Sequence, residues 1–184
     1  MKFRHLLWFV WLALLPAVGH ASSVRPLELE DLVRQSYQIF VGRVVATHQG
    51  TMPDSNLAYT EYTVSVSDWI KGGSSPTLTF RQLGRSGGAL FVPGLPQYRK
   101  GDEVLLFIHQ PSEIGLTSPV GMQQGHYRIE RATNGERYVR AGSMLPSVVR
   151  LSSRARAAES PAASGAPSDR VLLTDFLTLV RQIH

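Results

Sequence analysis

The sequence lacks cysteine entirely, although it runs to 184 residues. This absence excludes a disulfide framework, a thiolate nucleophile, a cysteine-ligated zinc ion and a lipid-bearing cysteine. Beyond its first eighteen residues the sequence also lacks any apolar run long enough to span a bilayer as a helix. Stability must therefore come from an ordinary packed core.

The first 21 residues have the pattern of an export signal. Lys2 and Arg4 give a basic start, and the run from Leu6 to Val18 is apolar. Gly19 and Ala21 place small residues at the two positions that a signal peptidase reads. We expect cleavage after Ala21 and a periplasmic or extracellular protein with no stable membrane insertion. The alternative is an uncleaved N-terminal anchor.

Removal of residues 1–21 would leave 163 residues with a formal net charge of +3, because two basic residues and no acidic ones are lost. That length suits one domain. We divide the chain into a signal peptide (1–21), a β domain (22–149), a flexible Ala/Ser/Pro linker (150–169) and a C-terminal helix (170–184). The linker lacks aromatic residues and cannot bury enough apolar surface to offset its ordering entropy.

Six short runs rich in β-branched and aromatic residues, separated by turn-forming residues, predict an antiparallel sheet. They are Ile39–His48, Tyr59–Asp68, Thr77–Leu83, Glu103–His109, His126–Arg131 and Arg137–Arg140. Apolar residues at helical spacing predict a helix over Leu27–Ser36 and another over residues 170–184. Because a small sheet must close or cover its edges, we expect a mainly β fold: a small OB-like antiparallel barrel of five to six strands with a short N-terminal helix and a C-terminal helix.

The long connection from Gly84 to Gly101, between the third and fourth predicted strands, is the candidate binding site. Connections of this length are often functional. Arg81, Arg85, Arg99 and Lys100, with Phe91 and Tyr98, form a basic and aromatic ledge for an anionic or extended ligand, and nucleic acid is not the expected partner. The residues expected to bind a protein partner are Arg81, Arg85, Phe91, Leu95, Tyr98 and Arg99. Two alternatives stay open: a loop folded down over one mouth of the barrel, and a solvated charged rim.

No catalytic, metal or cofactor site is expected. Gly84 to Gly88 fits the G-x-S-x-G pattern around Ser86, but two prolines in the following residues prevent the helix that a nucleophile elbow requires. The histidines of the β region have neither the helical spacing nor the carboxylate of a catalytic zinc site. They are His48, His109 and His126. The enzymatic alternative is a small exported hydrolase that uses Ser86 with a histidine at the barrel rim.

Three segments resemble the barrel of the tissue inhibitors of metalloproteinases and of netrin-like modules. They are the apolar strand Ser36–Val45 with its Val-Gly-Arg-Val-Val end, the strand Tyr62–Val66 that continues into Trp69–Gly72, and Lys100–Phe107 with its Gly-Asp-Glu start. The resemblance covers residues 27–141 and extends to bacterial exported proteins of the same pattern. It implies an OB-type barrel and a protein partner, with an exported metalloprotease as the partner class.

The chain departs from the inhibitor family at its mature N-terminus. In that family an N-terminal cysteine chelates the zinc of the protease, whereas the expected first residue here is Ser22. Inhibition of a protease would thus need another surface, such as the loop from Gly84 to Tyr98. The third reading is a structural envelope component whose terminal helix docks on another protein through Phe176 and Val180.

A mature chain that begins at Ser22 is the expected product of expression in a bacterial host. The intact mass of the exported protein measures this directly. The Ala21→Arg variant should keep residues 1–21, because the peptidase requires a small side chain at that position. A wild-type mass that includes residues 1–21 would instead indicate an anchor.

Overall fold

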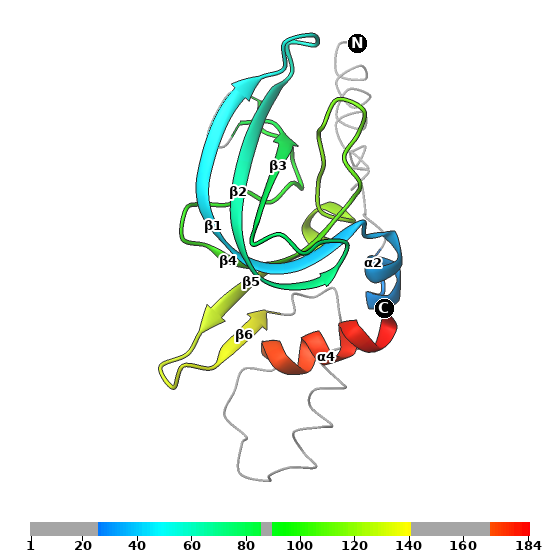
Figure 1. Ribbon diagram of the computed structural model, residues 1–184, viewed down its shortest axis with the longest axis vertical. Helices are drawn as coiled ribbons and strands as arrows, with labels where there is room; N and C mark the ends of the chain where they lie inside the picture. The colour runs from blue at the N-terminus through cyan, green and yellow to red at the C-terminus, as the bar shows by residue number, and fades with distance from the viewer. Residues whose placement is uncertain (1–25, 86–89, 141–169) are drawn as a thin grey trace, which may run out of the picture.

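The structure is a computed structural model that describes residues 26–85, 90–140 and 170–184 (Figure 1). Its strands form one seven-stranded antiparallel sheet in the order β3-β2-β1-β4-β5-β6-β7. The strands are β1 (Gln38–Thr51), β2 (Ala58–Lys71), β3 (Thr77–Leu83), β4 (Glu103–Ile108), β5 (His126–Arg131), β6 (Arg137–Arg140) and β7 (Arg170–Leu172). The helices are α2 (Leu29–Gln35), α4 (Leu173–Ile183) and the 3-10 turn η1 (Met122–Gly125).

The six predicted strands and both helices are confirmed, except that residues 170–172, predicted to belong to the C-terminal helix, form an additional strand and α4 begins at Leu173. Strands β3, β5 and β6 have the predicted bounds, and β1 and β2 extend further than predicted. The added strand, β7, is three residues long and pairs Val171 with Val139 of β6. A three-residue strand is too short to show an alternating pattern, so only its pairing with β6 reveals it.

The sheet is open, so the expected closed barrel is not confirmed. Strand β3 lies at one end of the strand order and β7 at the other. Residues 109–120 cover part of the outer edge of β3, because Leu116 forms a parallel bridge with Arg81. In the same segment Pro119 forms an antiparallel bridge with Ile108 of β4. The Thr117 amide also donates a hydrogen bond to the carbonyl oxygen of Arg81 at 2.8 Å.

Strand β1 is strongly curved (Figure 1) and approaches β2 closely at a glycine. Its register with β2 shifts at three places, one of them between Val41 and Gly42, and such bulges increase the local bend and twist of a strand. A Cβ atom on Gly42 would lie 2.5 Å from Val64 Cγ1 and 2.7 Å from the carbonyl oxygen of Ser65. Only glycine therefore lets β1 approach β2 this closely.

Strand β1 contributes to two separate hydrophobic cores, because alternate residues of a strand face opposite sides of the sheet. Ile39 and Val41 of β1 face the helices, together with buried residues of β4 to β7. Phe40 and Val44 face the concave side. The second core consists of Phe40, Val44, Tyr62, Val64, Phe80, Tyr98, Val104, Leu106 and Ile108.

The terminal helix α4 packs on its own sheet, in red below the strands in Figure 1. Phe176 and Val180 have no exposed surface, and the ring centroid of Phe176 lies 5.0 Å from that of Tyr127. This packing disagrees with the alternative in which Phe176 and Val180 dock on another protein. Within the described residues, no helix is long and apolar enough to cross a membrane.

The Phe176→Ala variant should lower the free energy of unfolding by about 3–5 kcal/mol, because it removes a fully buried aromatic side chain and leaves a cavity. Urea unfolding measures the change. The control is Thr178→Ala on the exposed face of α4, where a change within about 0.5 kcal/mol is expected. Equal stability of the two variants would contradict the packing of α4.

Candidate functional site

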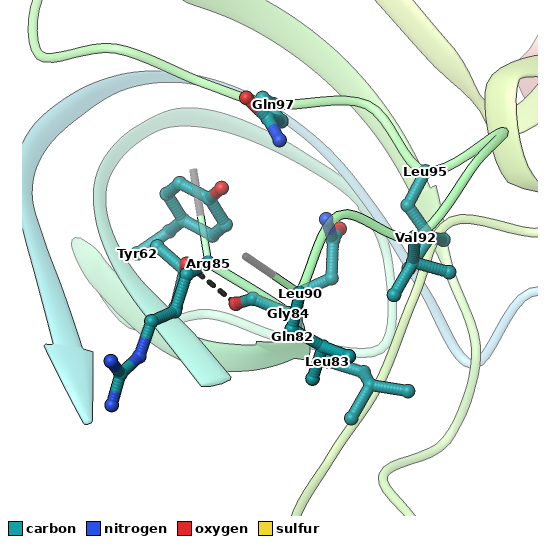
Figure 2. A pocket seen from close by; sticks show the side chains of 10 residues that line it. Tyr62, Gln82, Leu83, Gly84, Arg85, Leu90, Val92, Leu95 and Gln97 are labelled. Carbon is teal, nitrogen blue, oxygen red and sulfur yellow. Dashed lines mark hydrogen bonds between the residues drawn. The ribbon is translucent and has the colours of Figure 1, made fainter. Parts of the chain in front are cut away.

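The loop between β3 and β4 is held firmly at its base. The Gly84 amide donates to the carbonyl oxygen of Ala58 at 2.8 Å, and the Thr60 hydroxyl donates to the carbonyl oxygen of Gly84 at 2.8 Å. The Arg85 amide donates to the carbonyl oxygen of Leu90 at 3.0 Å (Figure 2). These bonds tie Gly84 to the start of β2 and join Arg85 to Leu90 on the other side of residues 86–89, which lie outside the described structure.

A buried amide anchors the return of the loop. Gln82 of β3 is only 3% exposed, and its Nε2 donates to the carbonyl oxygen of Pro96 at 2.8 Å. Gln82 and Gln97 line a cavity of about 10 Å³ (Figure 2). That is room for about one water molecule. The buried Oε1 of Gln82 has no hydrogen-bond partner among the described residues, so a water in this cavity would satisfy it.

Beyond these anchors the loop presents apolar side chains to solvent. Leu90 is 43% exposed and Phe91 57% exposed. Leu57, 37% exposed, lies in the β1–β2 turn beside Ala58, which is hydrogen-bonded to Gly84. We call Leu57, Leu90 and Phe91 the apolar tip. Leu95 is half-buried and lines the cavity, so the loop covers the sheet with one part and exposes another.

Two arginines of the predicted ledge lie near the base of the loop. Arg81 Nε donates to Glu61 Oε2 at 2.8 Å, and its guanidinium carbon lies 5.0 Å from the ring centroid of Tyr59. The hydrogen bond to Glu61 raises the pKa of Arg81. Arg85 Nη2 donates to the Thr51 hydroxyl at 2.9 Å, which ties the loop to the end of β1.

Tyr98 does not belong to the ledge, and this corrects the prediction. It is 2% exposed and meets the ring of Tyr62 edge-on at 4.8 Å. Burial raises its pKa well above the usual value. Tyr98 is part of the concave core because the returning chain passes under the sheet there. Its hydroxyl and His126 Nε2 are both buried without hydrogen-bond partners in the described structure.

Arg99 also lies apart from the apolar tip. Its amide donates to Asp102 Oδ2 at 2.9 Å, and the neighbouring Gly101 amide donates to the carbonyl oxygen of Val44. Arg85, by contrast, contacts Thr51, seven residues further along β1. At 3.3 Å per strand residue, the two places are roughly 20 Å apart. The predicted ledge is therefore two separate surfaces.

The three histidines do not converge. His109 follows Ile108, which pairs with Gln38 at the start of β1, whereas His48 lies ten residues further along that strand. His126 is largely buried beside Tyr98, with ring centroids 5.2 Å apart. Ser86 lies outside the described residues. In the described ranges, no three His, Asp or Glu side chains are grouped as metal ligands.

Comparison of the sequence with known proteins identifies no relative, so the functional argument rests on the geometry of the loop between β3 and β4. No protein-family model matches the chain, and no curated protein sequence matches it. The geometry provides an anchored loop that exposes an apolar tip, with Arg81 and Arg85 near the loop base. Leu57 was not predicted, because nothing in a polar turn sequence reveals that it lies beside a loop some thirty residues away.

The burial of His126 predicts acid sensitivity. Burial, aided by the nearby Arg128, lowers its pKa to about 4. The unfolded chain takes up the proton near pH 6.5. The stability of the folded state is therefore complete above pH 6.5 and falls as the pH drops toward 4. Between pH 7 and pH 5 His126 should account for a loss of about 2 kcal/mol.

Urea unfolding at the two pH values measures this loss, and the His126→Leu variant should lack it. His48→Gln is the control, because His48 is exposed on β1. Equal pH dependence in the wild type and His126→Leu would contradict the assignment.

Proposed function

We propose that the protein is an exported, non-catalytic binding module that contacts a protein partner through the apolar tip. The observation that carries this proposal is the exposure of Leu90 and Phe91 on a loop that is hydrogen-bonded to β2 at Gly84 and closed by a bond from Arg85 to Leu90. Exposed aromatic anchors at the centre of a surface contribute most of the affinity in many protein interfaces. The binding surface comprises the apolar tip with Arg81 and Arg85 at its margin.

The anchoring of the loop favours binding because less entropy is lost on association. Ordering flexible segments at an interface costs affinity, and a loop held in place before contact avoids much of that cost. Gln82 and Thr60 hold the loop by buried hydrogen bonds. A partner that fits has an apolar pocket for Phe91 and acidic groups at its rim for Arg81 and Arg85.

The proposal includes an OB-type barrel of the kind found in the metalloproteinase inhibitors and netrin-like modules. Its support is the segment 109–120, which bridges to β3 at Arg81 and to β4 at Ile108 and so spans the gap between these strands. An exported metalloprotease is the partner class that the resemblance implies. The apolar tip would then replace the missing N-terminal cysteine as the contact surface.

The two other readings have less support. A hydrolase that uses Ser86 would need a histidine beside the loop. His126 is half-buried against Tyr98, and His109 lies at the far end of β1 from the loop base, which leaves His48, exposed on β1 three residues before Thr51, as the candidate. A structural envelope component would use a surface other than the buried face of α4. Neither reading is favoured by a contact in the described structure.

The Phe91→Ser variant should lose partner binding while the domain stays folded, because Phe91 is exposed and contributes little to the core. Partners captured from the envelope and the culture medium are identified by mass spectrometry. The dissociation constant of each purified partner is then measured. A loss of about 2 kcal/mol in binding free energy, roughly thirty-fold in affinity, is expected for a central aromatic anchor.

The matched control is Ile114→Ser, since Ile114 is also an exposed apolar residue, at 47%, in a different turn. Equal losses in both variants, or binding unchanged by Phe91→Ser, would refute the proposed surface. For a captured metalloprotease, inhibition that disappears with Phe91→Ser would assign the inhibitory contact to the apolar tip.

A further inference from the structure

A second surface, rich in arginine, gathers around the turn that enters β4. Four strands contribute side chains to it, and the turn from Arg99 to Glu103 lies at its centre. The basic surface consists of Arg43, Arg99, Lys100, Arg128, Arg131 and Arg137, together with Asp102 and Glu103.

Glu103 is shared by three guanidinium groups. The Arg43, Arg131 and Arg137 side chains lie 3.2, 3.3 and 3.1 Å from its carboxylate oxygens. Arg131 and Arg137 are direct cross-strand partners in β5 and β6, a placement in which like charges repel. One carboxylate cannot neutralise three cations, so this cluster keeps a positive charge.

The turn that enters β4 also pairs an acidic side chain, that of Asp102, with an arginine. Arg128 lies 3.1 Å from Asp102, and Arg43 also donates to the carbonyl oxygen of Gly101 at 3.2 Å. The side chains of Asp102 and Glu103 are 18% and 14% exposed, whereas those of Arg43 and Arg128 are 53% and 54% exposed. The two carboxylates are therefore largely shielded from solvent, whereas the guanidinium groups of Arg43 and Arg128 are exposed to it.

Charge is distributed very unevenly over the molecule. The basic surface has six cationic and two acidic residues, an excess of four, while the whole chain has a net charge of +5. The rest of the chain is therefore almost neutral. A local excess of this kind attracts anionic partners over a range set by the ionic strength.

The extent of the basic surface indicates the kind of anion. It crosses β1, β4, β5 and β6, which are neighbours in the sheet. Three interstrand spacings make it roughly 15 Å wide, too wide for one phosphate. Guanidinium groups bind phosphate oxygens in pairs.

We propose that the basic surface docks the protein on a membrane rich in anionic phospholipid, with its arginines contacting lipid phosphates. The β5–β6 hairpin, in yellow, lies on the side of the molecule away from α2 in Figure 1. The apolar tip lies roughly 20 Å away along β1, so a docked molecule keeps it available. This docking is independent of the partner contact proposed above.

The test is co-sedimentation with vesicles of phosphatidylcholine alone or mixed with phosphatidylglycerol. The protein is used as isolated from cells, and all variants share its N-terminal state. Wild-type protein should bind the mixed vesicles more strongly, and added salt should reduce the difference. The Arg99→Gln/Lys100→Gln variant removes two exposed cations and leaves every ion pair of Glu103 in place. Its partition into mixed vesicles should fall on the order of thirty-fold.

The Arg131→Gln/Arg137→Gln variant tests the cluster itself and should show a similar fall. The control, Arg34→Gln/Lys71→Gln, removes two cations beside α2 and should retain most of the binding. Equal wild-type binding to both vesicle types, or an equal fall in the control, would refute the proposal. Binding to soluble heparin without binding to mixed vesicles would also refute it, in favour of an anionic polymer.

Discussion

The close approach of β1 to β2 at Gly42 is the constraint on which the other features depend. Any side chain at this position would collide with Val64 and with the backbone of Ser65. Because the approach is possible, β1 can bend while it pairs with β2 along its whole length and with β4 along its first half. A single strand thereby contributes to both cores: Val41 packs toward the helices and Phe40 toward the concave side.

The loop after β3 derives its order from that bent sheet. The concave core accepts Tyr98 from the returning chain, and the buried amide of Gln82 holds Pro96 just before it. Between Gly84 and Pro96, Leu95 lines the cavity beside Gln82, whereas Leu90 and Phe91 are exposed to solvent. The exposed apolar surface thus lies between the two anchored ends of the loop.

The two proposed surfaces lie along the same strand and use different physics. At the distal end of β1, binding is favoured because a partner removes apolar surface from water. In the middle of β1, near Arg43, the acids are shielded and the guanidinium groups are exposed, so attraction is electrostatic and sensitive to salt. A membrane contact through the arginines would orient the molecule and restrict where a partner can approach Phe91.

Local patterns in the sequence determined the secondary structure of this protein. The alternation of Tyr62, Val64 and Val66 with polar residues specifies β2, because successive strand side chains face opposite sides. The spacing of Phe176 and Val180 specifies α4. The exposed Phe91 and the flanking Arg81 and Arg85 were also predicted, since a long loop between strands lies at the surface.

Only the tertiary structure decided what depends on residues far apart in the chain. Tyr98 is buried because Tyr62 and His126 surround it, and its immediate neighbours in the sequence contain no sign of this. Strand β7 exists because β6 provides an edge for it. Glu103 meets Arg137 across 34 residues, so the arginine cluster arises from strand register. Periodicity is a local property of the sequence, whereas register and burial are set by the whole fold.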